Sequence, residues 1–173
     1  MTQFTIPEGS GDVIASYVRQ KAREWSVAQM VERVAAAVAE LETAARAIPA
    51  EHLDIVAEGE EWTPAHTIDH VTAINIGTAT RCLAVATTGK LPVAEPAPLP
   101  EGRDHRLHAH RARLEAVFAG LIDAGPPRHL DVTWEHPFLG DLDWREWLLT
   151  LRVHSKAHAE QIAAMGQKLA AGR

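Results

Sequence analysis

Apolar residues recur at steps of three and four along four long segments of the chain, which is the pattern of amphipathic α-helices. The first segment begins after Ser26, where Ser26 and Gln29 have the spacing of a capping box, and it ends at Pro49. Its apolar positions are Val27, Met30, Val31, Val34, Val38, Leu41, Ala45 and Ile48. A shorter helix is predicted before it, over residues 13–25.

The second helix is predicted between Thr63 and Gly89. Thr63 suits the N-cap, Pro64 suits the first helical position, and Gly89 ends the run. Residues 90–102 follow, with four prolines from Pro92 onward. Proline cannot donate a backbone hydrogen bond, so this stretch predicts an extended crossover rather than a helix.

The third helix is predicted over residues 104–122. Its apolar stripe consists of Leu107, Leu114, Val117, Phe118 and Leu121. Residues 125–143 show no helical period, and we expect them to be irregular, with a short strand around residues 130–134.

The last helix is predicted to open at Asp141 or Asp143, because Asp143 and Glu146 repeat the capping-box spacing. Its stripe is Trp144, Trp147, Leu148, Leu151, His154, His158, Ile162, Met165 and Leu169. Four long helices with one long crossover between the second and third predict an all-α, up-down-down-up four-helix bundle. We expect one domain over residues 1–173, with an irregular or β-like segment before the last helix.

Composition narrows the class of partner. The 173 residues are 46% hydrophobic and carry a formal net charge of −6. An acidic chain argues against nucleic acid or an anionic membrane as the main partner, and no window approaches the roughly 18 apolar residues of a membrane helix. With Cys82 as the one cysteine and no signal-peptide pattern, we expect a cytoplasmic protein that acts on a small molecule.

Two histidines lie on the apolar stripe of the last helix. At 100° per residue, His158 falls about 40° from His154, and Trp147 falls about 20° from it. Two imidazoles therefore take core positions, and a buried polar group needs a partner. A carbonyl or water could satisfy each ring, or both rings could converge on one metal ion. The spacing by itself leaves both interpretations open.

The second helix offers further histidines. His70 shares a face with Ile74 and Gly77, which would direct it into the bundle. His66 lies in the first turn, where we expect a polar residue near the surface; the alternative is a fourth ligand at the rim. Of the cluster at 105, 108 and 110, only His110 approaches the core stripe.

Other residues could line such a site. Gln161 lies one turn beyond His158, where it could orient a ligand or bond to a neighbouring helix. Arg81 lies about 16 Å along the helix from His70, where it could hold a substrate carboxylate or form a salt bridge. Trp147 is expected in the core or in a pocket wall. His136 could reach the mouth of the site or stabilise a turn.

Several familiar chemistries are excluded by their motifs. The sequence HSKAH at residues 154–158 lacks the glutamate that zincin proteases use as general base. The chain has no G-x-S-x-G elbow and no G-x-G-x-x-G loop. Cys82 is expected to be a small buried residue rather than a nucleophile.

Two motifs together resemble the DinB-like metal-binding superfamily. They are EWTPAHTIDHV at residues 61–71 and HPFLGDLDWREWLLTLRVHSKAHAEQI at residues 136–162. The resemblance spans about residues 27–169. It implies that His70, His154 and His158 bind a divalent ion such as zinc, nickel, manganese or iron. It also implies a homodimer, and some members are thiol-dependent S-transferases or isomerases.

Three neutral imidazoles would leave the ion its full charge and open coordination positions, which suits zinc or nickel better than magnesium or calcium. Such an ion would act as a Lewis acid on water or on a low-molecular-weight thiol. Two functions follow. One is a metal-dependent enzyme, a thiol S-transferase, isomerase or hydrolase, acting on a small electrophile. The other is a non-catalytic metal- or ligand-binding bundle of the stress response.

Overall fold

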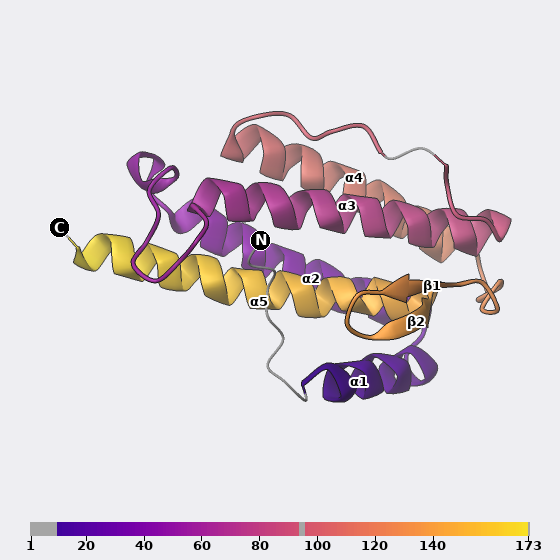
Figure 1. Ribbon diagram of the computed structural model, residues 1–173. Helices are drawn as coiled ribbons and strands as arrows, with labels where there is room; N and C mark the ends of the chain where they lie inside the picture. Colours follow the sequence, from indigo (N-terminus) through magenta and orange to yellow (C-terminus); the bar gives the residue numbers. More distant parts are fainter. Residues whose placement is uncertain (1–9, 94–95, 173) are drawn as a thin grey trace.

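The computed structural model describes residues 10–93 and 96–172, and within them the chain forms a helical bundle with one β-hairpin (Figure 1). The elements are α1 (Ser10–Glu24), α2 (Val27–Ala47), the short 3-10 helix η1 (Ala50–His52), α3 (Pro64–Thr88), α4 (Arg103–Asp123), β1 (Thr133–His136), β2 (Gly140–Asp143) and α5 (Trp144–Ala171). The predicted all-α class is confirmed. None of the helices in these ranges is long and apolar enough to cross a lipid bilayer.

The predicted helix ends are confirmed by their capping groups. The Ser26 hydroxyl accepts a hydrogen bond from the backbone N–H of Gln29 at 3.2 Å, and the Gln29 side chain accepts one from the N–H of Ser26 at 2.9 Å. Asp143 and Glu146 make the same reciprocal pair at the start of α5. Gly89 closes α3 in the left-handed conformation, with φ +69°. Each cap provides partners for backbone groups that the helix leaves unbonded.

Helices α2 and α5 run in one direction, and α3 and α4 run in the other, so the order is up-down-down-up (Figure 1). Two contacts establish the antiparallel register of α3 against α5: Thr67 meets Met165, and Asn75 meets Ser155. Because α3 and α4 are parallel, the chain must return along the bundle between them. The proline-rich crossover makes that return, and its described residues contain no helix or strand.

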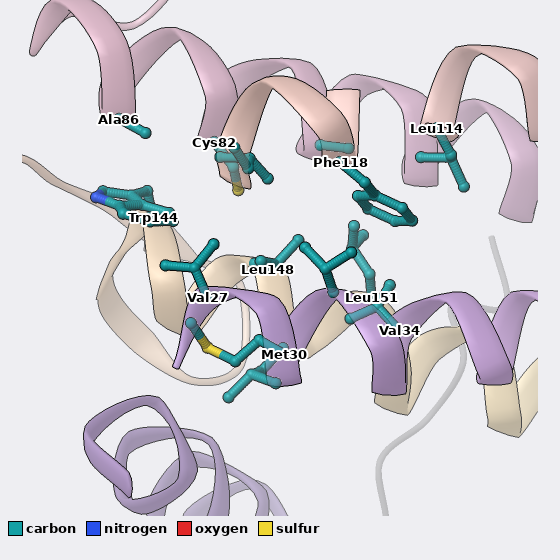
Figure 2. Packing of buried hydrophobic residues seen from close by; sticks show 14 of the residues in the cluster. Val27, Met30, Val34, Cys82, Ala86, Leu114, Phe118, Trp144, Leu148 and Leu151 are labelled. Carbon is teal, nitrogen blue, oxygen red and sulfur yellow. The ribbon is translucent and has the colours of Figure 1, made fainter. Parts of the chain in front are cut away.

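The core fills the space between α2, α3, α4 and α5 (Figure 2). Trp144, Met30 and Leu148 are among the residues fully removed from solvent. Cys82 packs among them with no exposed surface, and burial raises the pKa of its thiol well above the usual range. The expectation of a small buried residue at this position is confirmed.

The segment before α5 is a hairpin rather than the single strand expected around residues 130–134. β1 pairs antiparallel with β2, and His136 lies opposite Gly140 across the turn. Gly140 has φ +74°, which the three-residue turn requires. The second strand, GDLD, contains no β-branched or aromatic residue, so propensity does not reveal it. Burial of Leu142 against Ala15 of α1 stabilises it instead.

A fully buried polar cluster joins three helices in the core. The Asn75 side-chain amide donates to the Ser155 hydroxyl at 3.1 Å and lies 3.4 Å from Nε2 of His110. An amide N–H can only donate, so Nε2 of His110 accepts and the ring is neutral. In the described part of the chain, Nδ1 of His110 has no hydrogen-bond partner. Burial lowers the pKa of His110 to about 4.

We expect acid to destabilise the protein through His110. Its folded pKa of about 4 lies below the unfolded value of about 6.5, so the unfolded state binds the proton more readily, and stability is lost as pH falls from about 6.5 through about 4. Between about pH 7 and pH 4.5 the loss should be on the order of 2–3 kcal/mol.

The measurement is urea unfolding of metal-free protein at both pH values, for the wild type and for His110→Leu. The leucine has similar bulk and does not titrate, so the variant should lose correspondingly less stability on acidification. An equal loss in both proteins would assign the acid sensitivity to other groups.

Candidate metal site

The structure brings together three histidines from two helices. His70 comes from α3, and His154 and His158 come from α5. One ring nitrogen from each lies within 4.8 Å of the other two. The ring centroid of His70 is 5.5 Å from that of His154 and 5.3 Å from that of His158. The antiparallel packing of α3 on α5 produces this meeting, because it places the first turns of α3 opposite the middle of α5.

A chain of hydrogen bonds determines which nitrogen of His158 carries the proton. Nδ1 of His158 lies 2.8 Å from Oε1 of Gln161, and Nε2 of Gln161 donates to Glu60 at 3.2 Å. Lys168 donates to the same carboxylate at 2.7 Å, and this bond lowers the pKa of Glu60.

An ionised carboxylate can only accept a hydrogen bond, so the amide nitrogen of Gln161 must face Glu60. The amide oxygen of Gln161 therefore faces His158, and Nδ1 of His158 is the donor. In the neutral ring, Nε2 then carries a lone pair. This is the tautomer that a metal ligand bound through Nε2 requires.

The two helix-α5 histidines have the separation of a ligand pair. Their Nε2 atoms are 3.1 Å apart and form a hydrogen bond in which the Nε2–H of His154 donates to the lone pair of His158. Two nitrogens bound to one zinc ion at about 2.0–2.1 Å in tetrahedral geometry would be roughly 3.3–3.4 Å apart, which is close to the observed value. The donor set therefore fits a divalent ion of the kind that binds imidazole.

The electrostatics keep all three rings neutral. Burial lowers the pKa of His154 to about 3, and neighbouring His158 and His70 add to the effect. Burial also lowers the pKa of His158 and of His70. Neutral imidazoles are the form that binds a metal ion, so near pH 7 no proton has to be displaced from a charged ring.

The group lies at the edge of the core rather than in its centre. His158 is only 1% exposed, whereas His70 and His154 are partly exposed. Ile74, which was expected to face inward beside His70, is 45% exposed. A side chain added at Gly77 would meet no atom within 4 Å. This face of α3 therefore borders solvent.

An aromatic ring covers the α3 side of the group. The Trp62 ring lies 5.0 Å from that of His70 and 4.6 Å from that of His66. His66 is exposed in the first turn of α3, as expected, and its backbone N–H bonds to the hydroxyl of Thr63. Among the described residues, the group of converging nitrogens does not include His66. A fourth-ligand role for His66 stays a prediction.

Two further pocket candidates lie toward the hairpin end of the bundle. Trp147 is partly buried, and its indole N–H donates to the carbonyl of Trp134 at 3.0 Å while the two rings stack at 5.3 Å. Arg81 is partly buried and lies three turns beyond His70 on α3. A substrate-binding role for Arg81 stays a prediction. Gln161, in contrast, contacts a histidine of the group directly.

His136 contacts both its own turn and an aromatic residue of α5. Phe138 donates its backbone N–H to Nδ1 of His136 at 3.2 Å, so the turn-stabilising role is confirmed. The His136 ring also packs 4.8 Å from that of Trp147, and a positive charge on His136 would lower the pKa of His154 further. One histidine thus serves the turn and borders the candidate site.

Two residues near the group, Glu60 and Lys168, are not marked by any pattern in the sequence. Glu60 comes from the loop before α3, and it reaches Gln161 across 101 positions of sequence and Lys168 across 108. No periodicity or motif marks a loop glutamate as the partner of a helix that lies so far along the chain. Only the packing of the loop on α5 identifies it.

Comparison with known proteins identifies the family of the chain. The sequence model of the DinB superfamily matches residues 33–162, which is more than half of the chain and includes all three histidines. No curated protein and no solved structure matches the chain. Because this match covers most of the chain, the chain belongs to the DinB superfamily.

Proposed function

We propose that this protein binds a divalent metal ion through His70, His154 and His158 and uses it in catalysis on a small electrophilic substrate. The observation that carries the proposal is the pair of Nε2 atoms 3.1 Å apart, with the proton of His158 directed to Gln161. When bound, such an ion supplies Lewis acidity, which lowers the pKa of a coordinated water or thiol.

The donor set favours particular metals. Three imidazole nitrogens without a carboxylate suit zinc or nickel, with manganese and iron as weaker candidates, whereas magnesium and calcium prefer oxygen ligands. Glu60 is the nearest acidic partner in the hydrogen-bond chain, but it contacts Gln161 and Lys168 rather than a histidine. Its role is therefore to orient the His158 ring through Gln161.

The surroundings of the group support an enzyme. His70 and His154 are partly exposed, so two of the three rings border solvent. The Trp62 ring packs against the His70 ring on one side of the group. This combination suits transfer of a thiol to an electrophilic carbon, or hydrolysis of a small substrate.

A structural role for the ion is the second candidate. The three histidines come from α3 and α5, so an ion held by them would cross-link the two helices. The nearly complete burial of His158 favours this alternative. The two candidates differ in what metal removal does to the melting temperature and in whether the loaded protein turns over a substrate.

Both candidate functions require a bound metal ion, and we therefore expect about one tightly bound ion per chain. His154→Ala removes one of three ligands and should lower zinc affinity at least about tenfold. His108→Ala, an exposed histidine on α4, serves as the control and should bind zinc as the wild type does. Metal content after dialysis, measured by mass spectrometry, reports the outcome. Equal zinc in His154→Ala and wild type would contradict the proposed ligand set.

The orienting role of Gln161 gives a separate prediction. Gln161→Leu removes the acceptor for Nδ1 of His158, so the favoured tautomer is no longer held, and zinc affinity should fall about tenfold. Gln167→Leu changes an exposed glutamine on the same helix and should leave affinity unchanged. Competition with a chromophoric chelator measures both. An unaltered affinity in Gln161→Leu would mean that the ring is oriented by other contacts.

The catalytic proposal predicts thiol conjugation by the metal-loaded protein. Zinc- or nickel-loaded wild type should conjugate low-molecular-weight thiols to monochlorobimane well above the uncatalysed rate, and His154→Ala should not. Bimane fluorescence measures the rate. Absence of conjugation and of ester hydrolysis, together with a melting temperature that falls on metal removal, would favour the structural candidate instead.

A further inference from the structure

The β1–β2 hairpin places one more histidine beside the candidate metal site. Along β1, Thr133 and Glu135 are exposed, whereas Trp134 and His136 are partly buried. Neighbouring side chains of a strand point to opposite faces. His136 therefore lies on the face of the hairpin that packs on the bundle, against Trp147, which lies two turns before His154 on α5.

Two contacts hold the His136 ring in one orientation. Its Nδ1 accepts the backbone N–H of Phe138 at 3.2 Å, and its ring lies 4.8 Å from that of Trp147. A nitrogen that accepts a hydrogen bond carries no proton, so in the neutral ring the proton is on Nε2. Burial lowers the pKa of His136, which favours the neutral ring. The side chain thus presents an oriented N–H donor.

This arrangement is unsuited to metal ligation. A ligand nitrogen needs a free lone pair, but Nδ1 of His136 is engaged by the turn and Nε2 carries the proton. Among the described residues, the group of nitrogens within 4.8 Å of one another does not include His136. The available function of the ring is to donate a hydrogen bond to a molecule held next to the three histidines.

We propose that His136 is a positioning residue, which donates its Nε2–H to an anionic oxygen or sulfur atom of a small molecule held at the three-histidine site. The proposal rests on the proposed metal-binding function. This role of His136 implies a class of substrate that carries an anionic group beside the reacting centre. A hydroxamate, a carboxylate and a thiolate are such groups. The hairpin then recognises that atom, and α3 and α5 supply the three histidines.

The test uses cobalt-loaded protein and acetohydroxamate, a small probe whose oxygens bind metal ions and accept hydrogen bonds. His136→Phe keeps an aromatic ring against Trp147 and removes the donor. We expect the Kd for acetohydroxamate, measured from the visible spectrum of cobalt, to rise about tenfold. His136→Gln retains an N–H donor and should recover most of the affinity.

Glu135→Ala is the matched control, because it changes the same strand on its exposed face and should bind the probe as the wild type does. An unchanged Kd in His136→Phe overturns the proposal while leaving the metal site intact. Loss of cobalt or of the folded state in both His136 variants also overturns it, because the residue would then be structural. Failure of the wild type to bind cobalt overturns the proposed function together with this inference.

Discussion

The hydrogen bond between Nδ1 of His158 and Oε1 of Gln161 is the interaction on which the candidate site depends. Its direction is determined by Glu60, which is held by Lys168 and accepts a hydrogen bond from the amide nitrogen of Gln161, so that the amide oxygen of Gln161 faces His158. The proton of His158 is thereby kept on the side of the ring away from His154, and a lone pair faces the place where the three rings converge. A surface ion pair thus determines the protonation of a nearly fully buried side chain.

The packing of α3 against α5 determines which groups share that place. Antiparallel register puts His70 opposite His154 and His158, and the same register puts Asn75 against Ser155, the neighbour of His154 on α5. Neighbouring residues of α5 therefore serve two different surroundings: His154 joins a partly exposed group of histidines, and Ser155 joins a fully buried polar cluster with Asn75 and His110.

The hairpin completes the surroundings of the site, although it lies outside the bundle. Its turn engages one nitrogen of His136, and stacking of Trp134 on Trp147 attaches its first strand to α5. Leu142, which lies opposite Trp134 and so on the same face, packs with Leu139 against Ala15 of α1. The short first helix therefore supports the element that borders the histidines, even though it contributes none of them.

Local rules determined much of this protein from the sequence by itself. The helical period, the capping pairs Ser26–Gln29 and Asp143–Glu146, and the phase of His154 and His158 on the core stripe all act within a few residues, so the pattern reveals them. Tertiary structure alone decided the rest. Four features depend on which elements meet: the pairing of Glu60 with Gln161, the place of His136 beside His154, the second strand of the hairpin, and the exposure of Ile74. The packing of segments far apart in the chain determines which elements meet, and no local preference reveals it.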